Sequence, residues 1–249
     1  MALCRATRIK RARNRDRLRQ RKILSARSIA MSKYVLVYTM NKVGSSSVKK
    51  AAESGGSIVG RAHPLNFHTI DLNDYGPVIT IVRDPIARNL SAFMEFRDNY
   101  FDPFPSEYSP DMLQVFIDQF PHEEPEWWFS QHVYPNFSLD VLGVPFPKTK
   151  GWKIYDGFFL VIKTEALNRA FPEAFKSLTD LGDDVPIVIE HRAIGFEKHG
   201  PETGAVYKEF LENAKFDQAF LDRMYETAFV KHFYLASEIK KFRNRWTDK

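Results

Sequence analysis

The lysine, glycine and serine residues of segment 42–47 have the types and spacing that suit phosphate binding. A lysine supplies a cation, and a glycine lets the backbone turn tightly close to a ligand. Three consecutive serines then provide hydroxyls and backbone amides at the predicted start of a helix, where anions bind. The candidate phosphate-binding residues are Lys42, Gly44, Ser45, Ser46, Ser47 and Val48.

The order of these residues differs from that of the nucleotide-triphosphate loop. That loop reads G-x-x-x-x-G-K-[ST], with lysine after the second glycine, whereas Lys42 precedes Gly44. The cation is therefore expected on the strand side of the turn and the hydroxyls on the helix side. Serine-rich turns that contain a lysine are common, so the segment alone is equally compatible with a turn that binds nothing.

A second candidate group lies in segment 78–93, VITIVRDPIARNLSAF. Arg83 directly follows an apolar run, and Ser91 lies about two turns into the helix predicted after it. Arg88 and Ser91 are three residues apart and therefore share one helix face. A guanidinium and a hydroxyl at these positions could grip a second phosphate.

Each group follows a run that predicts a buried strand. Residues 34–38 and 78–82 are β-branched or aromatic without polar alternation, which is typical of strands buried on both faces of a parallel sheet. Asp84 is placed to cap the next helix, with Pro85 at its first position. Because open α/β sheets bind ligands at the carboxyl ends of their strands, both groups are expected at one sheet edge.

The pair of motifs, K-x-G-S-S-S after one strand and R-D-P-x-x-R-x-x-S after a later one, resembles the sulfotransferases that use 3′-phosphoadenosine 5′-phosphosulfate. In that family the first motif holds the 5′-phosphosulfate and the second holds the 3′-phosphate. The resemblance implies that Lys42 contacts the bridging oxygen, that residues 44–47 form the 5′ loop, and that Arg83 and Ser91 bind the 3′-phosphate. It also implies a P-loop-like, three-layer α/β/α fold.

Other segments resemble one bacterial branch of this family, which is associated with capsular polysaccharide synthesis. They are residues 157–167 and 220–246, and the similarity spans about Lys33 to Trp246. That branch often carries a Lys-Trp-Tyr element near residue 198. This chain reads Glu197-Lys198-His199-Gly200-Pro201 instead, so the element is altered here.

His63 is the candidate catalytic base, in the segment that follows a short predicted strand at 57–60. The resemblance supports this place, because in carbohydrate sulfotransferases a base often follows the second strand. His68 is an alternative base, and His63 could equally be a loop imidazole bonded to its neighbours. Metal-ligand spacings such as H-E-x-x-H and C-x-x-C do not occur in the sequence, so we expect a mechanism without a metal.

The remaining pattern predicts an α/β domain with a central, mainly parallel sheet of about five strands, closed by C-terminal helices. Thr164 is expected to cap a helix, with Glu165 favourable at its positive end. Further strands are predicted at 139–144, 158–162 and 185–189, and helices at 111–117, 206–210, 216–225 and 237–246.

Trp127 and Trp128 stand in an aromatic stretch with acidic residues, 122–132. Aromatic faces and carboxylates suit sugar rings, so this stretch is a candidate border of an acceptor cleft. Packing of both tryptophans in the core is the alternative.

Positive charge is concentrated at the N-terminus. Residues 1–30 contain eleven Lys or Arg and one acid, which leaves 25 basic and 30 acidic residues in the other 219. We therefore expect a basic, disordered arm at 1–32 and one sulfotransferase-like domain at 33–249, which is mildly acidic and not a nucleic-acid binder. The arm could be a tether to a polyanion or membrane surface, an arginine-rich targeting segment, or sequence ahead of a start at Met31.

The single cysteine, Cys4, lies in this arm, so no intrachain disulfide can form. The arm has no apolar segment of the kind found in signal peptides or membrane spans. Together these features favour a cytoplasmic protein.

The sequence thus predicts transfer of a sulfuryl group from 3′-phosphoadenosine 5′-phosphosulfate to a hydroxyl or amine of a carbohydrate, with capsular or extracellular polysaccharide synthesis as the context. One alternative is a nucleotide-dependent kinase of P-loop type. Another is a relative that binds nucleotide or glycan without catalysis.

Overall fold

The computed structural model describes residues 34–63, 69–179 and 201–247. Several sequence expectations concern residues outside these ranges. They are the arm at 1–32, His68, the strand at 185–189 and the altered element at 197–200.

Five strands form one sheet in the order β2-β1-β3-β5-β4. Neighbouring strands are parallel except β4, which lies antiparallel to β5 at one edge. The prediction of an α/β fold with a mainly parallel sheet of about five strands is confirmed. The strands are β1 (Tyr34–Tyr38), β2 (Ile58–Ala62), β3 (Val78–Val82), β4 (Trp152–Tyr155) and β5 (Phe159–Lys163).

The central strands are buried as their composition predicts. Every residue of β3 and β5 is buried, and in β1 only Tyr34 is exposed. Strands covered on both faces have no need of polar alternation, which is why these runs are continuously apolar or aromatic.

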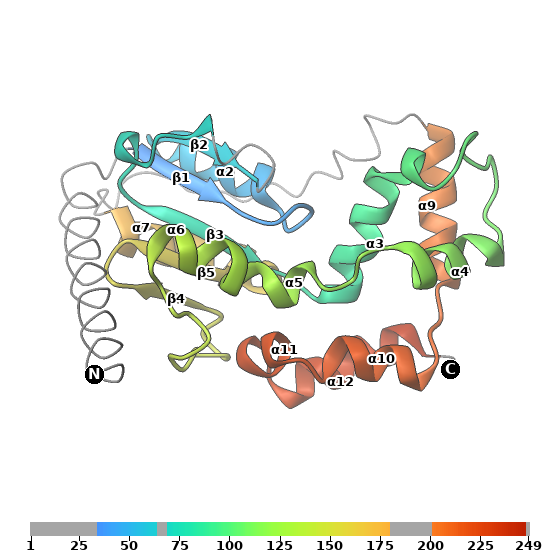
Figure 1. Cartoon of the computed structure of the whole chain (residues 1–249). Coiled ribbons are helices and arrows are strands. Elements are labelled where there is room, and N and C mark those ends of the chain that lie inside the picture. Colours follow the sequence, from blue (N-terminus) through green and yellow to red (C-terminus); the bar gives the residue numbers. More distant parts are fainter. Residues whose placement is uncertain (1–33, 64–68, 180–200, 248–249) are drawn as a thin grey trace, which may run out of the picture.

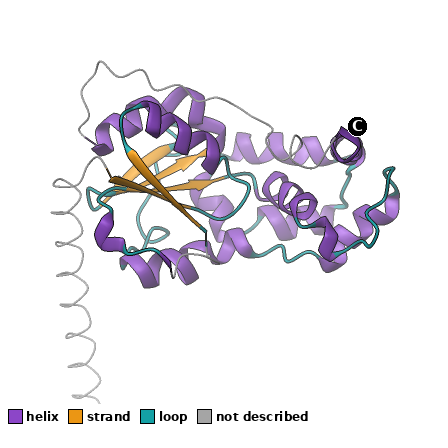
Figure 2. Ribbon diagram, turned by 90° about the horizontal axis from the view of Figure 1, so that it is seen from above, coloured by secondary structure: helices purple, strands orange, loops and turns teal. Residues whose placement is uncertain are grey.

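Helices lie on both faces of the sheet (Figures 1 and 2). One face carries α2 (Ser45–Ser54) and α7 (Leu167–Thr179), and the other carries a nearly continuous helical segment. Trp128 and Phe137 of that segment pack on Tyr38 of β1, with ring centroids 4.9 and 5.8 Å away. The segment comprises α5 (Glu124–Trp127), a π-helical stretch (Trp128–Val133) and α6 (Tyr134–Phe137).

A second group of helices packs beyond the carboxyl ends of the strands (Figure 1). Phenylalanines form its core, and Phe93 contacts Phe116 and Phe210 at ring distances of 5.3 and 5.9 Å. The helices are α3 (Pro85–Glu95), α4 (Pro110–Gln119), α9 (Pro201–Asn213), α10 (Gln218–Tyr225), α11 (Ala228–Phe233) and α12 (Ala236–Trp246). Single 3₁₀ turns occur at Leu72–Asp74, Arg97–Asn99 and Thr164–Ala166.

The strand predicted at 139–144 is wrong. The Asp140 side chain accepts a hydrogen bond from the Gly143 amide at 3.1 Å, so these residues form a turn. The edge strand β4 takes its place in the sheet. The sequence feature that marks β4 is the dipeptide Asp156-Gly157 after it. These two residues have φ angles of 48° and 75° and close a tight hairpin between β4 and β5.

The C-terminal helices are fastened to the sheet edge by three polar contacts. The Tyr225 hydroxyl donates to Asp84 at 2.9 Å, and the Tyr234 hydroxyl donates to Glu165 at 3.3 Å. Lys163, buried at the end of β5, pairs with Glu238 of α12 at 2.6 Å. Closure by C-terminal helices is thus as predicted, although α11 was not foreseen.

Within the part of the chain that the structure describes, every helix is too short or too polar to cross a bilayer.

Candidate functional site

The carboxyl ends of β1, β3 and β5 bring three loops together. These strands are parallel neighbours, with β3 in the middle. Residues 39–44, 83–84 and 164–166 therefore lie side by side. Such an edge is where open α/β sheets bind ligands.

The first of these loops turns sharply into α2. Lys42 and Gly44 have φ angles of 66° and 94°, in the left-handed region that favours glycine. The helical ladder begins at the Val48 amide, which donates to Gly44 at 3.1 Å, and no side chain caps the helix. The first-turn amides, at residues 45–47, have no acceptor within the helix.

The three carbonyls before Gly44 are held by side chains from other elements. Because a trans peptide directs its N–H opposite to its C=O, the amides of residues 42–44 point away from these donors. Backbone amides in a turn with left-handed residues are typical of anion-binding concavities. The bonds run from Arg88 Nε to Asn41 (3.0 Å), from Arg83 to Lys42 (2.7 Å) and from the Thr164 hydroxyl to Val43 (2.8 Å).

The Lys42 amine reaches the end of α3. Its Nζ lies 3.3 Å from Oε2 of Glu95, and both side chains are about a quarter exposed, at 23% and 27%. Glu95 follows Ser91 by four residues, so the two side chains share one face of α3. The amine therefore contacts a residue of α3 that lies about one helical turn beyond Ser91.

Arg83, Ser91 and Tyr207 gather at the same place. The Tyr207 and Ser91 side chains are hydrogen-bonded, and burial raises the pKa of Tyr207 while the charges of Arg83 and Arg245 oppose the shift. Arg83 is only partly buried. This cluster joins the end of β3 to helices α3, α9 and α12.

Arg88 is buried and holds the protein together rather than facing this cluster. Its guanidinium donates to Asn41, to Asn89 at 3.0 Å and to the Glu124 carboxylate, and 1% of the side chain is exposed. The expectation that Arg88 joins Ser91 on a phosphate is therefore wrong, because its donors are engaged within the protein. Arg88 instead supports the loop that carries Lys42.

His63 lies just past β2, beside the loop. Its Nδ1 is 2.8 Å from the Thr39 carbonyl. A carbonyl can only accept, so Nδ1 carries the proton and the Nε2 atom bears the lone pair that a base requires. Burial lowers the pKa of His63, an effect that the Thr39 bond partly opposes. Neutral imidazole is therefore the form present at pH 7.

The end of β5 contributes a carboxylate to this edge. Oε1 of Glu165 accepts from the Asp84 amide at 2.9 Å. Partial burial of this carboxylate raises the pKa of Glu165 to about 6, although the residue as a whole is exposed. Thr164 was expected to cap a helix, but its hydroxyl donates to Val43 instead.

The two tryptophans are separated by the fold. Trp128 is fully buried and donates to the Thr80 hydroxyl at 3.0 Å, as core packing requires. Trp127 is 45% exposed. Only Trp127 therefore remains available to border an acceptor cleft.

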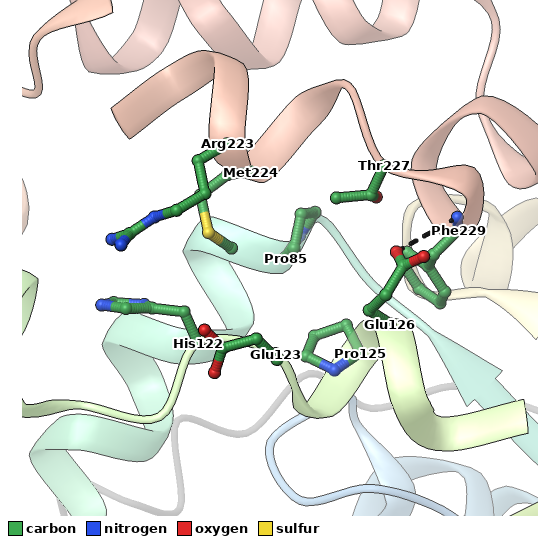
Figure 3. A pocket seen from close by; sticks show the side chains of 9 residues that line it. All are labelled: Pro85, His122, Glu123, Pro125, Glu126, Arg223, Met224, Thr227 and Phe229. Carbon is green, nitrogen blue, oxygen red and sulfur yellow. Dashed lines mark hydrogen bonds between the residues drawn. The ribbon is translucent and has the colours of Figure 1, made fainter. Parts of the chain in front are cut away.

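A separate pocket of about 80 Å³ lies between Pro85, residues 122–126 and helices α10 and α11 (Figure 3). Its lining is mainly apolar, and Glu126 accepts from the Phe229 amide at its rim. Among residues 34–63, 69–179 and 201–247, no group of three or more His, Cys, Asp or Glu is placed to hold a metal ion.

Sequence reasoning missed Glu95, Thr164 and Tyr207 as partners of the loop and the arginine cluster. Each is distant in sequence from the residue it contacts, and a lone polar residue in a helix gives no local signal. Comparison of the chain with protein-family models, curated proteins and solved structures gives no match.

Proposed function

We propose that this protein transfers a sulfuryl group from 3′-phosphoadenosine 5′-phosphosulfate to a hydroxyl or amine of a carbohydrate. The observation that carries the proposal is the hydrogen bond from Arg83 to the Lys42 carbonyl, 2.7 Å long, which joins the two motif segments at one sheet edge. The motif resemblance supplies the donor and the acceptor class. A P-loop-like character of the fold belongs to the same proposal.

The loop and the start of α2 would bind the 5′ side of the donor. The amides of residues 42–47 are oriented by the sheet edge and by the fastened carbonyls, so they would meet the anion without reorganising. Preorganised donors of this kind stabilise developing charge more effectively than water does. Lys42 would neutralise the charge that forms on the bridging oxygen.

Arg83 and Ser91 would bind the 3′-phosphate. Their place at the end of β3 and in the second turn of α3 supports this role, as does the hydrogen bond between Ser91 and Tyr207. A charge-assisted hydrogen bond contributes about 1.5–3 kcal/mol. These contacts would therefore select this donor over nucleotides without a 3′-phosphate.

In the reaction, an acceptor oxygen or nitrogen forms a bond to sulfur while the bond from sulfur to the bridging oxygen breaks. The electron pair of that bond leaves with adenosine 3′,5′-bisphosphate. Nε2 of His63 would take the acceptor proton, since its neutral ring lies beside the loop. Exposed Trp127 would offer a sugar a stacking surface.

A thermal-shift titration tests the proposal, because a ligand that binds the folded state raises its stability by mass action. Adenosine 3′,5′-bisphosphate should raise the melting temperature more than ATP with magnesium does. The reverse order would favour a kinase, which needs Mg²⁺. Binding of the bisphosphate without sulfate transfer to any carbohydrate would favour a non-catalytic relative.

A further inference from the structure

The ion pair between Lys42 and Glu95 has no explanation in the stability of α3. Glu95 is the last residue of that helix, where the helix dipole disfavours a negative charge. Its carboxylate instead lies against the Lys42 amine at 3.3 Å. The Lys42 amine therefore compensates this carboxylate at the helix end.

The Glu95 carboxylate lies close to the positions where the proposed donor, 3′-phosphoadenosine 5′-phosphosulfate, would carry negative charge. Lys42 would meet the sulfuryl end of the donor, and Ser91, one turn back on the same helix face, would meet its 3′-phosphate. An anion at either position is repelled by a carboxylate a few ångströms away. Glu95 thus opposes nucleotide binding through its contact with Lys42.

The ion pair between Lys42 and Glu95 is also weak enough to be broken by a ligand. Both side chains are about a quarter exposed, and solvent-accessible ion pairs contribute little to stability. A multiply charged ligand can therefore displace the carboxylate from the amine at little cost.

We propose that Glu95 is an internal counter-ion that occupies Lys42 in the ligand-free protein and is displaced when nucleotide binds. This inference rests on the proposed function and adds a residue that weakens nucleotide affinity. Because adenosine 3′,5′-bisphosphate carries negative charge at both ends, the same carboxylate also weakens binding of this leaving product.

The test is calorimetric titration of wild type and Glu95→Gln with adenosine 3′,5′-bisphosphate. Removing the charge should tighten binding about fivefold, which corresponds to about 1 kcal/mol. The gain should shrink at high ionic strength. Glu53→Gln is the matched control, because Glu53 pairs with Lys49 on the exposed side of α2, about 12 Å along the helix from Ser45. It should leave the affinity unchanged.

A double-mutant cycle with Lys42→Met separates displacement from general repulsion. If Glu95 acts through the amine, Glu95→Gln should gain much less affinity in the Lys42→Met background than in wild type. Equal gains in both backgrounds would overturn the counter-ion role. So would a loss of turnover in Glu95→Gln without tighter binding, which would make the carboxylate a base.

A parallel titration with inorganic sulfate keeps the two proposals apart. If wild type binds no adenosine 3′,5′-bisphosphate, the proposed function fails, whereas tighter sulfate binding by Glu95→Gln would still support the counter-ion. Equal or weaker binding of both probes by Glu95→Gln overturns the inference.

Discussion

Arg83 donates a 2.7 Å hydrogen bond to the backbone carbonyl of Lys42, across 41 residues of sequence. The residue that follows β3 thus fixes the backbone of the residue from which the candidate catalytic amine extends. Any ligand that engages the Arg83 guanidinium also acts on the shape of the Lys42 loop. The two candidate phosphate-binding segments are therefore joined by a direct hydrogen bond.

Replacing Lys42 with alanine should abolish most sulfate transfer and leave folding nearly unchanged. Folding changes little because lysine and alanine both carry a Cβ and are equally disfavoured by the positive φ at position 42. The ion pair with Glu95 that is lost contributes only about 0–1 kcal/mol. Turnover with the sulfated donor and urea unfolding check the two parts. Near-normal turnover would remove Lys42 from the mechanism.

Ser91→Ala should weaken binding of adenosine 3′,5′-bisphosphate about tenfold and leave that of adenosine 5′-phosphate almost unchanged, because only the former has a 3′-phosphate. Arg83→Ala should weaken the bisphosphate more, with a smaller loss for the monophosphate through the loosened loop. Ser54→Ala, at the far end of α2, is the control. Equal losses for both nucleotides in Ser91→Ala would argue against a 3′-phosphate site.

Arg88→Ala should destabilise the protein by about 1.5–3 kcal/mol, because it removes the buried guanidinium that bonds Asn41, Asn89 and Glu124. The matched change Arg243→Ala breaks pairs with Asp222 and Glu226 on the surface and should cost much less, because solvent screens exposed ion pairs. Free energies of unfolding in urea measure both. Similar values for the two variants would contradict the structural role of Arg88.

The pH dependence of kcat/KM should follow the protonation of His63. Burial lowers its pKa, so the base form persists below the ordinary histidine value of about 6.5, and the acidic limb of the profile should lie below that pH. His63→Ala should lower turnover about 10²–10⁴-fold and remove the limb. An unchanged limb in His63→Ala would assign the base elsewhere.

His122 should make the fold sensitive to acid. Burial lowers its pKa, and its Nε2 donates to the Phe116 carbonyl at 2.9 Å. Because the folded-state pKa is the lower one, the neutral ring stabilises the protein above about pH 6.5, and this stability is lost as pH falls through the folded-state pKa. One titrating group can add at most about 1.4 kcal/mol per pH unit to the slope.

His122→Phe should flatten that slope, since the ring packs edge-on to Phe116 and Phe220 and tolerates an aromatic replacement. Urea unfolding between about pH 5 and 7 measures the free energy of unfolding for both proteins. A slope equal to that of wild type would show that other groups cause the acid sensitivity.

The sequence predicted what is encoded locally. Strands β1 and β3 are long apolar runs, and the Asp84 cap is a neighbour interaction, with its carboxylate 3.1 Å from the Ile86 amide. The candidate site was predictable only as far as its two motifs. Glu95 and Thr164 meet the loop through tertiary contacts that span 53 and 121 residues, and no periodic pattern encodes such pairings. Arg88 was wrongly predicted to bind phosphate. Its burial depends on an ion pair with Glu124, 36 residues away in the sequence, which no local pattern shows.

Tyr225, Tyr234 and Glu238 attach the C-terminal helices to Asp84, Glu165 and Lys163, which directly border the Lys42 loop. A ligand that binds this edge more tightly when the helices are docked would, by linkage, also favour their docked state. Amide hydrogens of α10 and α12 should exchange more slowly when the edge is filled, so the tail of the chain serves as a remote reporter of what its beginning has bound.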